Sequence, residues 1–360
     1  MGTRRWRHGD WGSMQRRVTI RDVAARAGVS AGAVSLALND RPGVSDATRQ
    51  RIVDAARELG WSPNLAARSL AQSDRVHTIG MALTRGAAAG LDQVQMALIG
   101  GIEQVLAERP CALLLHTVPD RDAEIALYRQ WWQSGRVNGS VLVGVVADDP
   151  RLDPVHRLGM PAVAVSQPAL SGPFPAVWTD DGAAIAEAVR YLALLGHRRV
   201  GHVTGPATLG RTLLRSEAFT ATAAALPDVT ARTLPTDLSA HAGARATRTL
   251  LTGPDRPTAL VYDNDLMAVA GIAVAEELGL RVPDDVSLVA WDDSDLCRIT
   301  RPQLSALSHD PFAVGEEVAR CLLELLDNGR ASSRPAGTPV LVPRGTTGPA
   351  PLRSPAASGS

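Results

Sequence analysis

The chain has 360 residues, 45% of them hydrophobic and 21% charged, a length that suggests more than one domain. The formal net charge is zero, yet residues 1–75 contain 13 Arg against seven Asp and Glu, so a basic front precedes an acidic remainder. That asymmetry suits phosphate neutralisation by a small N-terminal domain. The chain contains no Lys, which excludes a P-loop lysine, a Schiff-base lysine and a pyridoxal phosphate site.

The three cysteines lie far apart and lack the spacing of a metal site, so we expect reduced core residues in a cytoplasmic protein: Cys111, Cys297 and Cys321. No apolar run approaches the ~20 residues that span a membrane, and the N-terminus lacks an apolar signal core. Residues 1–17 carry five Arg and two Trp. A basic arm on DNA is one interpretation, but we favour a disordered extension or a start codon assigned too early, since Met14 precedes the first helix.

Three short helices are predicted after this extension. Thr19 can cap the first, Asp22 suits its positive end, and Gly28 closes it after apolar residues at helical spacing. Ser30 can cap a second helix from Ala31 to about Leu38. A third starts at Ser45 and is closed by Gly60.

Helix, short glycine-containing turn and helix form the pattern of a helix-turn-helix, whose second helix enters the major groove of DNA. A helical cap on a larger enzyme is the alternative interpretation of this pattern alone. Four motifs in fixed order favour DNA binding, since the chain here resembles the LacI/GalR family of repressors: TIRDVAARAGVS, VSLALN, VSDATRQRI and ELGWSPNLAARSL.

The resemblance implies a hinge helix after the headpiece that orders on DNA and inserts a leucine, here Leu70, between base pairs in the minor groove. An apolar wedge of this kind unstacks a base step and kinks the duplex. The DNA-binding residues that position and resemblance suggest are Thr19, Ser30, Ala31, Gly32, Ala33, Ser35, Leu36 and Asn39 in the headpiece, and Asn64, Ala67, Arg68 and Leu70 in the hinge.

The second helix departs from the family pattern at the positions that usually carry polar or basic residues. Those positions hold Ala31, Gly32, Ala33 and Leu36, none of which can donate a bidentate hydrogen bond to a base edge. Sequence recognition should therefore depend on apolar contacts, backbone groups, neighbouring polar residues, DNA shape and the hinge wedge.

Strand-like and helix-like runs alternate over residues 76–347, which predicts an α/β domain built around parallel sheets. Two successive series suggest two lobes with a cleft between them, and ligands in such sheets bind beyond the carboxyl ends of strands. The predicted strands are His77–Thr84, Cys111–Val118, Ser140–Val146, Pro161–Ser166, Arg199–Thr204, Ala259–Tyr262 and Val286–Trp291. The predicted helices are Gln93–Arg109, Ala123–Gln133, Ala183–Leu195, Arg215–Ala225, Ala242–Leu251 and Leu266–Leu278.

The resemblance continues through WTDDGAAIAEAVRYLALLGHRRVGHVTG, PTALVYDNDLMAVAGIAVAEELGLRVPDDVSLVAWDDSDL and PVLVPRGTTG. It implies a two-lobed, periplasmic-binding-protein-like (type I) domain behind a small all-α headpiece. The expected boundaries are a basic extension at 1–17, the headpiece at 18–63, hinge and linker at 64–75, the effector and dimerisation domain at 76–347, and a disordered tail at 348–360. Within the large domain we expect an N-lobe at about 76–177 and 307–338, and a C-lobe at about 178–306 and 339–347.

Three residues are candidates for binding the effector. The resemblance places Arg215, at the start of its predicted helix, on hydroxyl or carboxylate groups of a ligand, although a surface arginine is the alternative. Asn264 follows a buried strand and offers a donor and an acceptor. Asp292 matches the family's effector-binding acid. We expect Asp265 to cap a helix and Asp293 to be structural, leave Asp180 and Asp181 open between helix capping and the site, and treat Arg211 as a weaker candidate.

No cofactor and no metal site is expected. We expect His197 to lie at a helix end where positive charge is favoured, and the other histidines are too scattered to suggest a metal site. Leu238 stands where some relatives use a stacking ring, and Trp178 and Trp291 could replace that ring or pack in the core. The resemblance alone suggests a sugar or related metabolite as the effector.

The sequence therefore predicts a sequence-specific, DNA-binding transcriptional repressor rather than an enzyme. Its expected partners are a near-palindromic double-stranded operator, a small-molecule effector and a second copy of itself, as a dimer or a tetramer, with no membrane partner. The main alternative is a solute-binding protein without DNA regulation. An enzyme is disfavoured because no nucleophile triad, glycine-rich phosphate loop or metal spacing is present.

Overall fold

The computed structural model describes residues 19–38, 42–59, 77–84 and 93–351. Contacts divide the chain into two compact units, Met1–Val76 and His77–Ser360. None of the helices in the described ranges is long and apolar enough to cross a bilayer.

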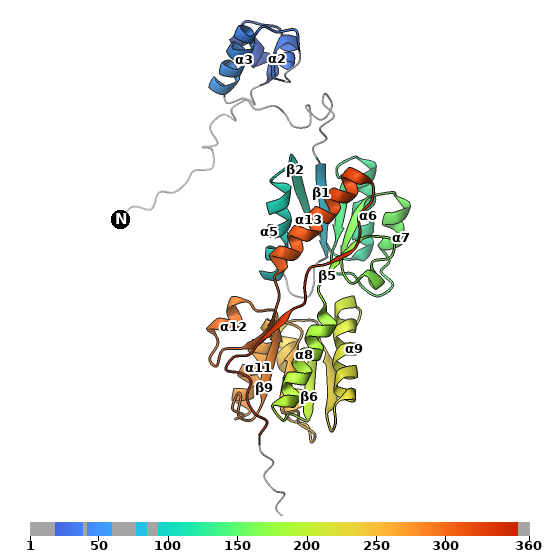
Figure 1. Ribbon diagram of the computed structural model, residues 1–360, viewed down its shortest axis with the longest axis vertical. Helices are drawn as coiled ribbons and strands as arrows, with labels where there is room; N and C mark the ends of the chain where they lie inside the picture. Colours follow the sequence, from blue (N-terminus) through green and yellow to red (C-terminus); the bar gives the residue numbers. More distant parts are fainter. Residues whose placement is uncertain (1–18, 39–41, 60–76, 85–92, 352–360) are drawn as a thin grey trace, which may run out of the picture. The chain divides into compact units, whose positions relative to one another are not determined.

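The described residues of the first unit form three helices (Figure 1). These helices pack around a small apolar core. Val23, Val34 and Ile52, one from each helix, are fully buried at its centre. The starts of all three helices agree with the predictions, and Ser45 caps the third through Thr48 N. The helices are α1 (Ile20–Ala27), α2 (Ala31–Leu38) and α3 (Asp46–Glu58).

The described residues of the second unit form two six-stranded sheets. The first sheet, in the N-lobe, is parallel throughout with strand order β11-β5-β4-β3-β1-β2. Its strands are β1 (His77–Thr84), β2 (Cys111–Val118), β3 (Gly139–Leu142), β4 (Ala162–Val165), β5 (Ala176–Trp178) and β11 (Arg334–Pro335). Helices cover both faces, as expected of a parallel sheet: α5 (Gln93–Leu106) and α13 (Pro311–Asn328) lie on one, and α6 (Arg121–Gln133) and α7 (Leu152–Arg157) on the other. A 3-10 turn, η1 (Pro168–Leu170), follows β4.

The C-lobe sheet has strand order β12-β10-β9-β8-β6-β7, and only β12 runs antiparallel to its neighbour. Its strands are β6 (Arg199–Thr204), β7 (Thr230–Pro235), β8 (Ala259–Tyr262), β9 (Ser287–Trp291), β10 (Ser305–Ser308) and β12 (Val340–Val342). Side chains alternate between two cores, since Val261 packs under α8 (Asp181–Leu194) and α9 (Gly210–Ala225), whereas Leu260 and Tyr262 pack under α10 (Ala240–Leu251) and α11 (Asp265–Glu277). A short helix, α12 (Asp295–Ile299), follows β9.

The described residues confirm the α/β class with parallel sheets but correct several expected bounds. Helix α9 begins at Gly210, five residues before the predicted start at Arg215. Strand β3 ends at Leu142 rather than Val146. Strand β10 extends to Ser308, so Leu307, which pairs with Trp291, belongs to the C-lobe sheet and not to the N-lobe segment expected from residue 307.

The C-terminal segment after β12 packs against the C-lobe further than predicted. Ala350 N donates a hydrogen bond to Leu195 O at 2.8 Å. The carbonyl of Gly348 lies 3.1 Å from Nε2 of the buried His197. The expectation of a disordered tail starting at residue 348 is therefore wrong for residues 348–351.

Candidate functional site

The headpiece begins with a reciprocal hydrogen-bonded cap. Thr19 N and Thr19 Oγ1 both donate to Asp22 Oδ2, at 2.8 and 2.6 Å. Gly28 ends α1 with a left-handed φ of 67° and donates its N–H to Ala24 O. Ser30 Oγ then accepts from Ala33 N at 3.1 Å, so both predicted caps of the helix-turn-helix are present.

Helix α2 places no charged side chain on its surface. Val34 and Ala37 face the headpiece core, whereas Gly32 is exposed and Ala31, Ala33, Ser35 and Leu36 are half-buried. Of the predicted DNA-binding residues on α2, Ala31 packs partly against the core, whereas Gly32, Ala33, Ser35 and Leu36 are not part of it. The remaining DNA-binding predictions, Asn39, Asn64, Ala67, Arg68 and Leu70, lie outside the described residues.

A second candidate site lies at the carboxyl ends of the C-lobe strands. Asp263, Asp292 and His309 are the first residues after the adjacent strands β8, β9 and β10. Because parallel strands end at the same edge of a sheet, these three side chains share one rim. Asp181, from the start of α8, and Arg215, from the second turn of α9, complete the group, which we call the C-lobe rim cluster.

Arg215 lies at the centre of this cluster and is only 5% exposed. Its Nε and Nη2 both lie 2.8 Å from Asp181 Oδ2. Its Nη1 donates to Asp263 O at 3.3 Å and lies 3.6 Å from Asp263 Oδ1. The guanidinium carbon stands 3.4 Å above the centre of the Trp291 ring, within the range of a cation–π contact.

The surrounding carboxylates hold Arg215 in its charged form. Burial alone would lower the pKa of this guanidinium, but Asp181, Asp263 and Asp292 outweigh burial and raise it. The alternative of a surface arginine is therefore wrong. The roles of Asp180 and Asp181, which the sequence left open, are different. Asp180 caps α8 by accepting a hydrogen bond from Ala183 N, whereas Asp181 binds Arg215.

Asp263 is buried and was not among the predicted site residues. Burial alone would raise the pKa of its carboxyl, but His202 and Arg215 outweigh this and lower the pKa to about 2. Its Oδ1 lies 3.1 Å from His202 Nε2 and its Oδ2 accepts from Gly205 N at 2.8 Å. Asp263 is the first residue after a buried strand, the signal that selected the adjacent Asn264, so it could have been found.

Asp292 follows β9 with a left-handed φ of 69°, a conformation that L-residues rarely adopt. Its Oδ1 lies 2.7 Å from Nε2 of His309, and the aspartate side chain remains 17% exposed. Backbone strain at a strand end is common where a side chain is aimed at a ligand. The neighbouring Asp293 instead binds Arg344 at 2.8 Å and Arg298 at 3.2 Å, which is consistent with the structural role expected for it.

Asn264 has the role that was expected of Asp265. Its Oδ1 accepts from Met267 N at 2.8 Å, so it caps α11, and its Nδ2 donates to Leu238 O at 2.9 Å. Both polar atoms of the amide are therefore engaged within the protein. Asp265 is the first residue of the helix and accepts a hydrogen bond from Ser294, so the expectation that it is the cap is wrong.

Two further predictions are decided by burial. Arg211 is exposed at the first turn of α9 and makes no contact that would place it in the cluster. His197 is fully buried between Thr258 and Ser287, and burial lowers its pKa, so the expectation of favoured positive charge is wrong. The described residues contain no group of acidic, histidine and cysteine side chains that could hold a metal ion.

Burial also decides the predictions for one tryptophan and the three cysteines. Trp291 is 2% exposed and forms part of the C-lobe core beneath Arg215, so it contributes a ring to the cluster from below rather than a free stacking surface. Cys297 and Cys321 are buried as expected, but Cys111 is only half-buried at the edge of the N-lobe core.

Comparisons with known proteins match both units. Residues 19–64 match the model of bacterial regulatory proteins of the lacI family, and residues 189–347 match a periplasmic binding protein-like domain. The HTH-type transcriptional regulator MalR of Streptomyces coelicolor is 33% identical over 344 residues, covering 92% of this chain and 97% of that protein.

Solved structures show the same similarity. A complex titled transcriptional regulator CelR-cellobiose is 25% identical, with a TM-score of 0.68, and covers 92% of this chain and 100% of that chain. The lac repressor dimer bound to operator and the anti-inducer ONPF has the same coverage, a TM-score of 0.82 and 24% identity, which shows likeness of fold.

Proposed function

The chain belongs to the lacI family of bacterial regulatory proteins and is a DNA-binding transcriptional regulator, and on that basis we propose a repressor controlled by a small neutral effector. One observation carries this proposal: a capped helix-turn-helix and a two-lobed α/β domain with a charged rim occur in a single chain. The alternative of a solute-binding protein without DNA regulation is wrong, because the family match includes the headpiece.

The charge of the C-lobe rim cluster favours a neutral, hydroxyl-rich effector bound between the lobes. The carboxylates of Asp181, Asp263 and Asp292 surround one guanidinium, so an anionic ligand would be repelled by these carboxylates in a poorly solvated setting. Carboxylate oxygens accept hydrogen bonds from hydroxyl groups without a charge penalty to the ligand. The similarity to a regulator solved with cellobiose supports a sugar or related polyol.

On the DNA side, we propose that α2 reads a near-palindromic operator mainly through shape and apolar contact. The described side chains of α2 include no Arg, Asn or Gln for bidentate base recognition. Two copies would place their α2 helices on successive major-groove faces, which is why a homodimer is proposed. Leu70 would supply the minor-groove wedge, and a protein working on chromosomal DNA would act in the cytoplasm by binding rather than by catalysis.

Selection of bound duplexes from a random pool, followed by a gel-shift titration, tests the DNA function. We expect one preferred, near-palindromic sequence, and binding that does not distinguish it from bulk DNA would end the proposal. Leu70→Ala should weaken binding and reduce bending of the selected duplex. Unchanged affinity and bending would exclude the wedge. Analytical ultracentrifugation of the same sample decides between dimer and tetramer.

Isothermal calorimetry with a panel of neutral sugars and their phosphorylated forms tests the effector site. Asp292→Asn should lose most of the affinity for the sugar that binds the parent protein, because it replaces a carboxylate acceptor at the rim. Asp295→Asn, four residues from β9 with a side chain 80% exposed, is the matched control and should bind normally. Arg215→Ala is the companion variant. Full affinity in both Asp292→Asn and Arg215→Ala, or preference for a phosphorylated ligand, would refute the assignment.

A further inference from the structure

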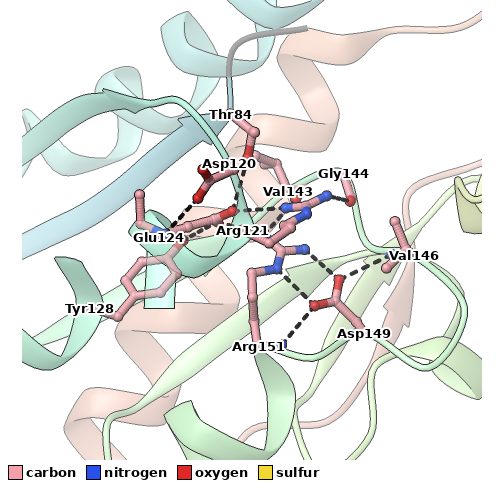
Figure 2. A network of polar contacts seen from close by, with 11 residues as sticks. Thr84, Asp120, Arg121, Glu124, Tyr128, Val143, Gly144, Val146, Asp149 and Arg151 are labelled. Carbon is pink, nitrogen blue, oxygen red and sulfur yellow. Dashed lines mark hydrogen bonds and ion pairs between the residues drawn. The ribbon is translucent and has the colours of Figure 1, made fainter. Parts of the chain in front are cut away.

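A second buried group of charges lies at the carboxyl ends of the N-lobe strands (Figure 2). Arg151 and Glu124 are both 0% exposed, and Arg151 Nη1 lies 2.6 Å from Glu124 Oε1. Arg151 also donates two hydrogen bonds to Asp149, from Nε to Oδ1 at 2.9 Å and from Nη2 to Oδ2 at 2.7 Å. Arg121 reaches Glu124 Oε2 at 2.8 Å. We call these four residues the N-lobe network.

Two neutral side chains also donate hydrogen bonds to the carboxylate of Glu124. Tyr128 Oη donates to its Oε1 and Thr84 Oγ1 donates to its Oε2, each at 3.0 Å. Burial would raise the pKa of the Asp149 carboxyl, but the hydrogen bonds and charge of Arg151 lower it. Burying charges is costly, and replacing such groups by apolar residues is often neutral or stabilising, so the network calls for an explanation other than stability.

The network holds the main chain of the loop that follows β3. Arg151 Nη1 donates to Val143 O at 3.0 Å, and Arg121 Nη2 donates to Gly144 O. Asp149 Oδ2 accepts from Val146 N at 3.0 Å. Three points of the loop, at residues 143, 144 and 146, are therefore bound to charged side chains of the N-lobe network, as Figure 2 shows. Gly144, with a left-handed φ of 58°, makes the sharp turn between them.

That loop pairs directly with the other lobe. Val146 and Leu209 form an isolated antiparallel bridge, and Gly210 N donates to Val145 O at 3.0 Å. Leu209 is the N-cap residue of α9 and Gly210 is its first residue, and the second turn of this helix carries Arg215. The approach is close, because a Cβ built on Gly210 would lie 2.4 Å from Leu170 Cδ1 and 3.1 Å from Val145 O.

We propose that the N-lobe network is a positioning device for this interlobe bridge, and that making or breaking the bridge couples lobe arrangement to α9 and Arg215. The effect of the bridge on DNA affinity rests on the proposed function, whereas the positioning of the bridge by the network does not. The network binds the loop, the loop binds the first turn of α9, and Arg215 lies on that helix in the C-lobe rim cluster. Neither the network nor the bridge needs to touch the effector.

A cysteine pair tests whether the bridge forms in solution and whether the network positions it. Val146 and Leu209 form a pair without hydrogen bonds between them, a geometry whose Cα separation of about 4.5 Å permits a disulfide. The full-length Val146→Cys/Leu209→Cys variant is placed in a glutathione redox buffer, and the rate of cross-linking is followed by thiol titration and non-reducing peptide mass analysis. The two single-cysteine variants control for the natural cysteines.

The same cysteine pair is then combined with changes to the network. Asp149→Asn should slow cross-linking by about tenfold, because it removes the charge that binds Arg151 and Val146 N. Asp153→Asn is the matched control, since this neighbouring acid is 71% exposed and pairs with Arg157, and it should leave the rate unchanged. Equal rates in both backgrounds would overturn the positioning role.

Gly210→Ala keeps the proposal testable if Asp149→Asn fails to fold. It leaves the network intact and places a methyl group where the bridge forms, so it should slow cross-linking of residues 146 and 209 as well. Rapid cross-linking in the presence of this methyl group would show that the close approach seen here does not govern lobe contact.

The final measurement concerns DNA. The oxidised and the reduced forms of the cysteine pair are titrated against the duplex selected from the random pool. Coupling predicts that their affinities differ by about fivefold or more. Equal affinities would exclude the bridge from regulation. If the parent protein prefers no duplex, the proposed function fails, whereas the cross-linking rates still decide the role of the network.

Discussion

Replacing Gly101 with Ala is expected to separate helices α5 and α13 and to destabilise the N-lobe. A Cβ at Gly101 would lie 1.9 Å from Phe312 O and 3.0 Å from Glu316 N. Gly315 on the facing helix α13 also leaves no room for a side chain, since a Cβ built there would lie 2.1 Å from Leu98 O of α5. Because the obstructing atoms belong to the backbone, a side-chain rotation cannot relieve the contact.

The size of the effect follows from these distances. Carbon atoms pack at about 3.5 Å, so the helices must move apart by more than 1 Å, and a gap of that size forfeits up to about half of each dispersion contact. Overpacking of this kind costs about 3 kcal/mol at the upper end, against about 1 kcal/mol gained from the better helix propensity of Ala. The net expectation is a loss of about 2 kcal/mol.

The adjacent Gly100 provides a matched control on the same helix. Its Cβ would lie 3.4 Å from Phe312 Cε2, an ordinary contact with a side chain, so Gly100→Ala should be neutral or stabilise by up to about 1 kcal/mol. Differential scanning calorimetry of the full chain should show a Tm lowered by about 4–8 °C for Gly101→Ala and not lowered for Gly100→Ala. Equal Tm values for the two variants would refute the argument.

Three further outcomes are expected. Thr19→Ala removes the hydrogen bond from Thr19 Oγ1 to Asp22 but keeps the one from the backbone N–H, and it should weaken α1 by about 1 kcal/mol, seen as faster amide hydrogen exchange in α1; unchanged exchange would contradict it. The folded-state pKa of Asp263 is about 2, below its unfolded value, so its stabilising contribution is present above about pH 4 and is lost as pH falls towards about 2. Asp263→Asn should therefore flatten the acid dependence of C-lobe unfolding, and a parallel pH profile would argue against this role. Burial raises the pKa of Cys297 to about 12, so a thiol reagent at about pH 8 should modify the half-buried Cys111 first, and prompt reaction of Cys297 in the folded protein would be inconsistent with the structure.

The elements that could be predicted from sequence are those with strong local signals. Strands β1, β2, β6 and β8 agree with the expected bounds at both ends, because each is a compact apolar run closed by polar or turn-forming residues. Helix α9 begins five residues early because its first residues, Leu209 and Gly210, provide no side-chain cap to mark the start. Strand β7 was not predicted, since it lies at a sheet edge with mostly exposed side chains and lacks an apolar run.

The candidate site was predictable where it depends on strand ends and not where it depends on distant pairing. The family resemblance identified Asp292, whereas Asn264 was selected because it follows a buried strand. That rule applied to the first residue after β8 would have identified Asp263. The pairing of Arg215 with Asp181 joins positions 34 residues apart, and that of Arg151 with Glu124 joins positions 27 apart. Nothing local in the sequence specifies such partners, because the fold alone brings them together.

The two buried charge groups differ in balance, and this difference separates their roles. The N-lobe network pairs Arg121 and Arg151 with Glu124 and Asp149, so its charges cancel and its hydrogen bonds are directed at its own loop. The C-lobe rim cluster sets three carboxylates around the single guanidinium of Arg215, with His202 and His309 each bonded to one of those carboxylates. A hydroxyl-rich ligand can donate further hydrogen bonds to carboxylate oxygens such as those of the partly exposed Asp292.

Selectivity for the effector should therefore reside in the C-lobe, and control of lobe contact in the N-lobe. Asp292→Asn should change effector affinity in calorimetry while the cross-linking of residues 146 and 209 proceeds at the parent rate. Asp149→Asn should do the reverse in the effector-free protein, slowing the cross-link while the rim residues that contact the effector remain intact. Parallel changes in both measurements for either variant would mean that the two groups act as one site, and the division between recognition and coupling would have to be abandoned.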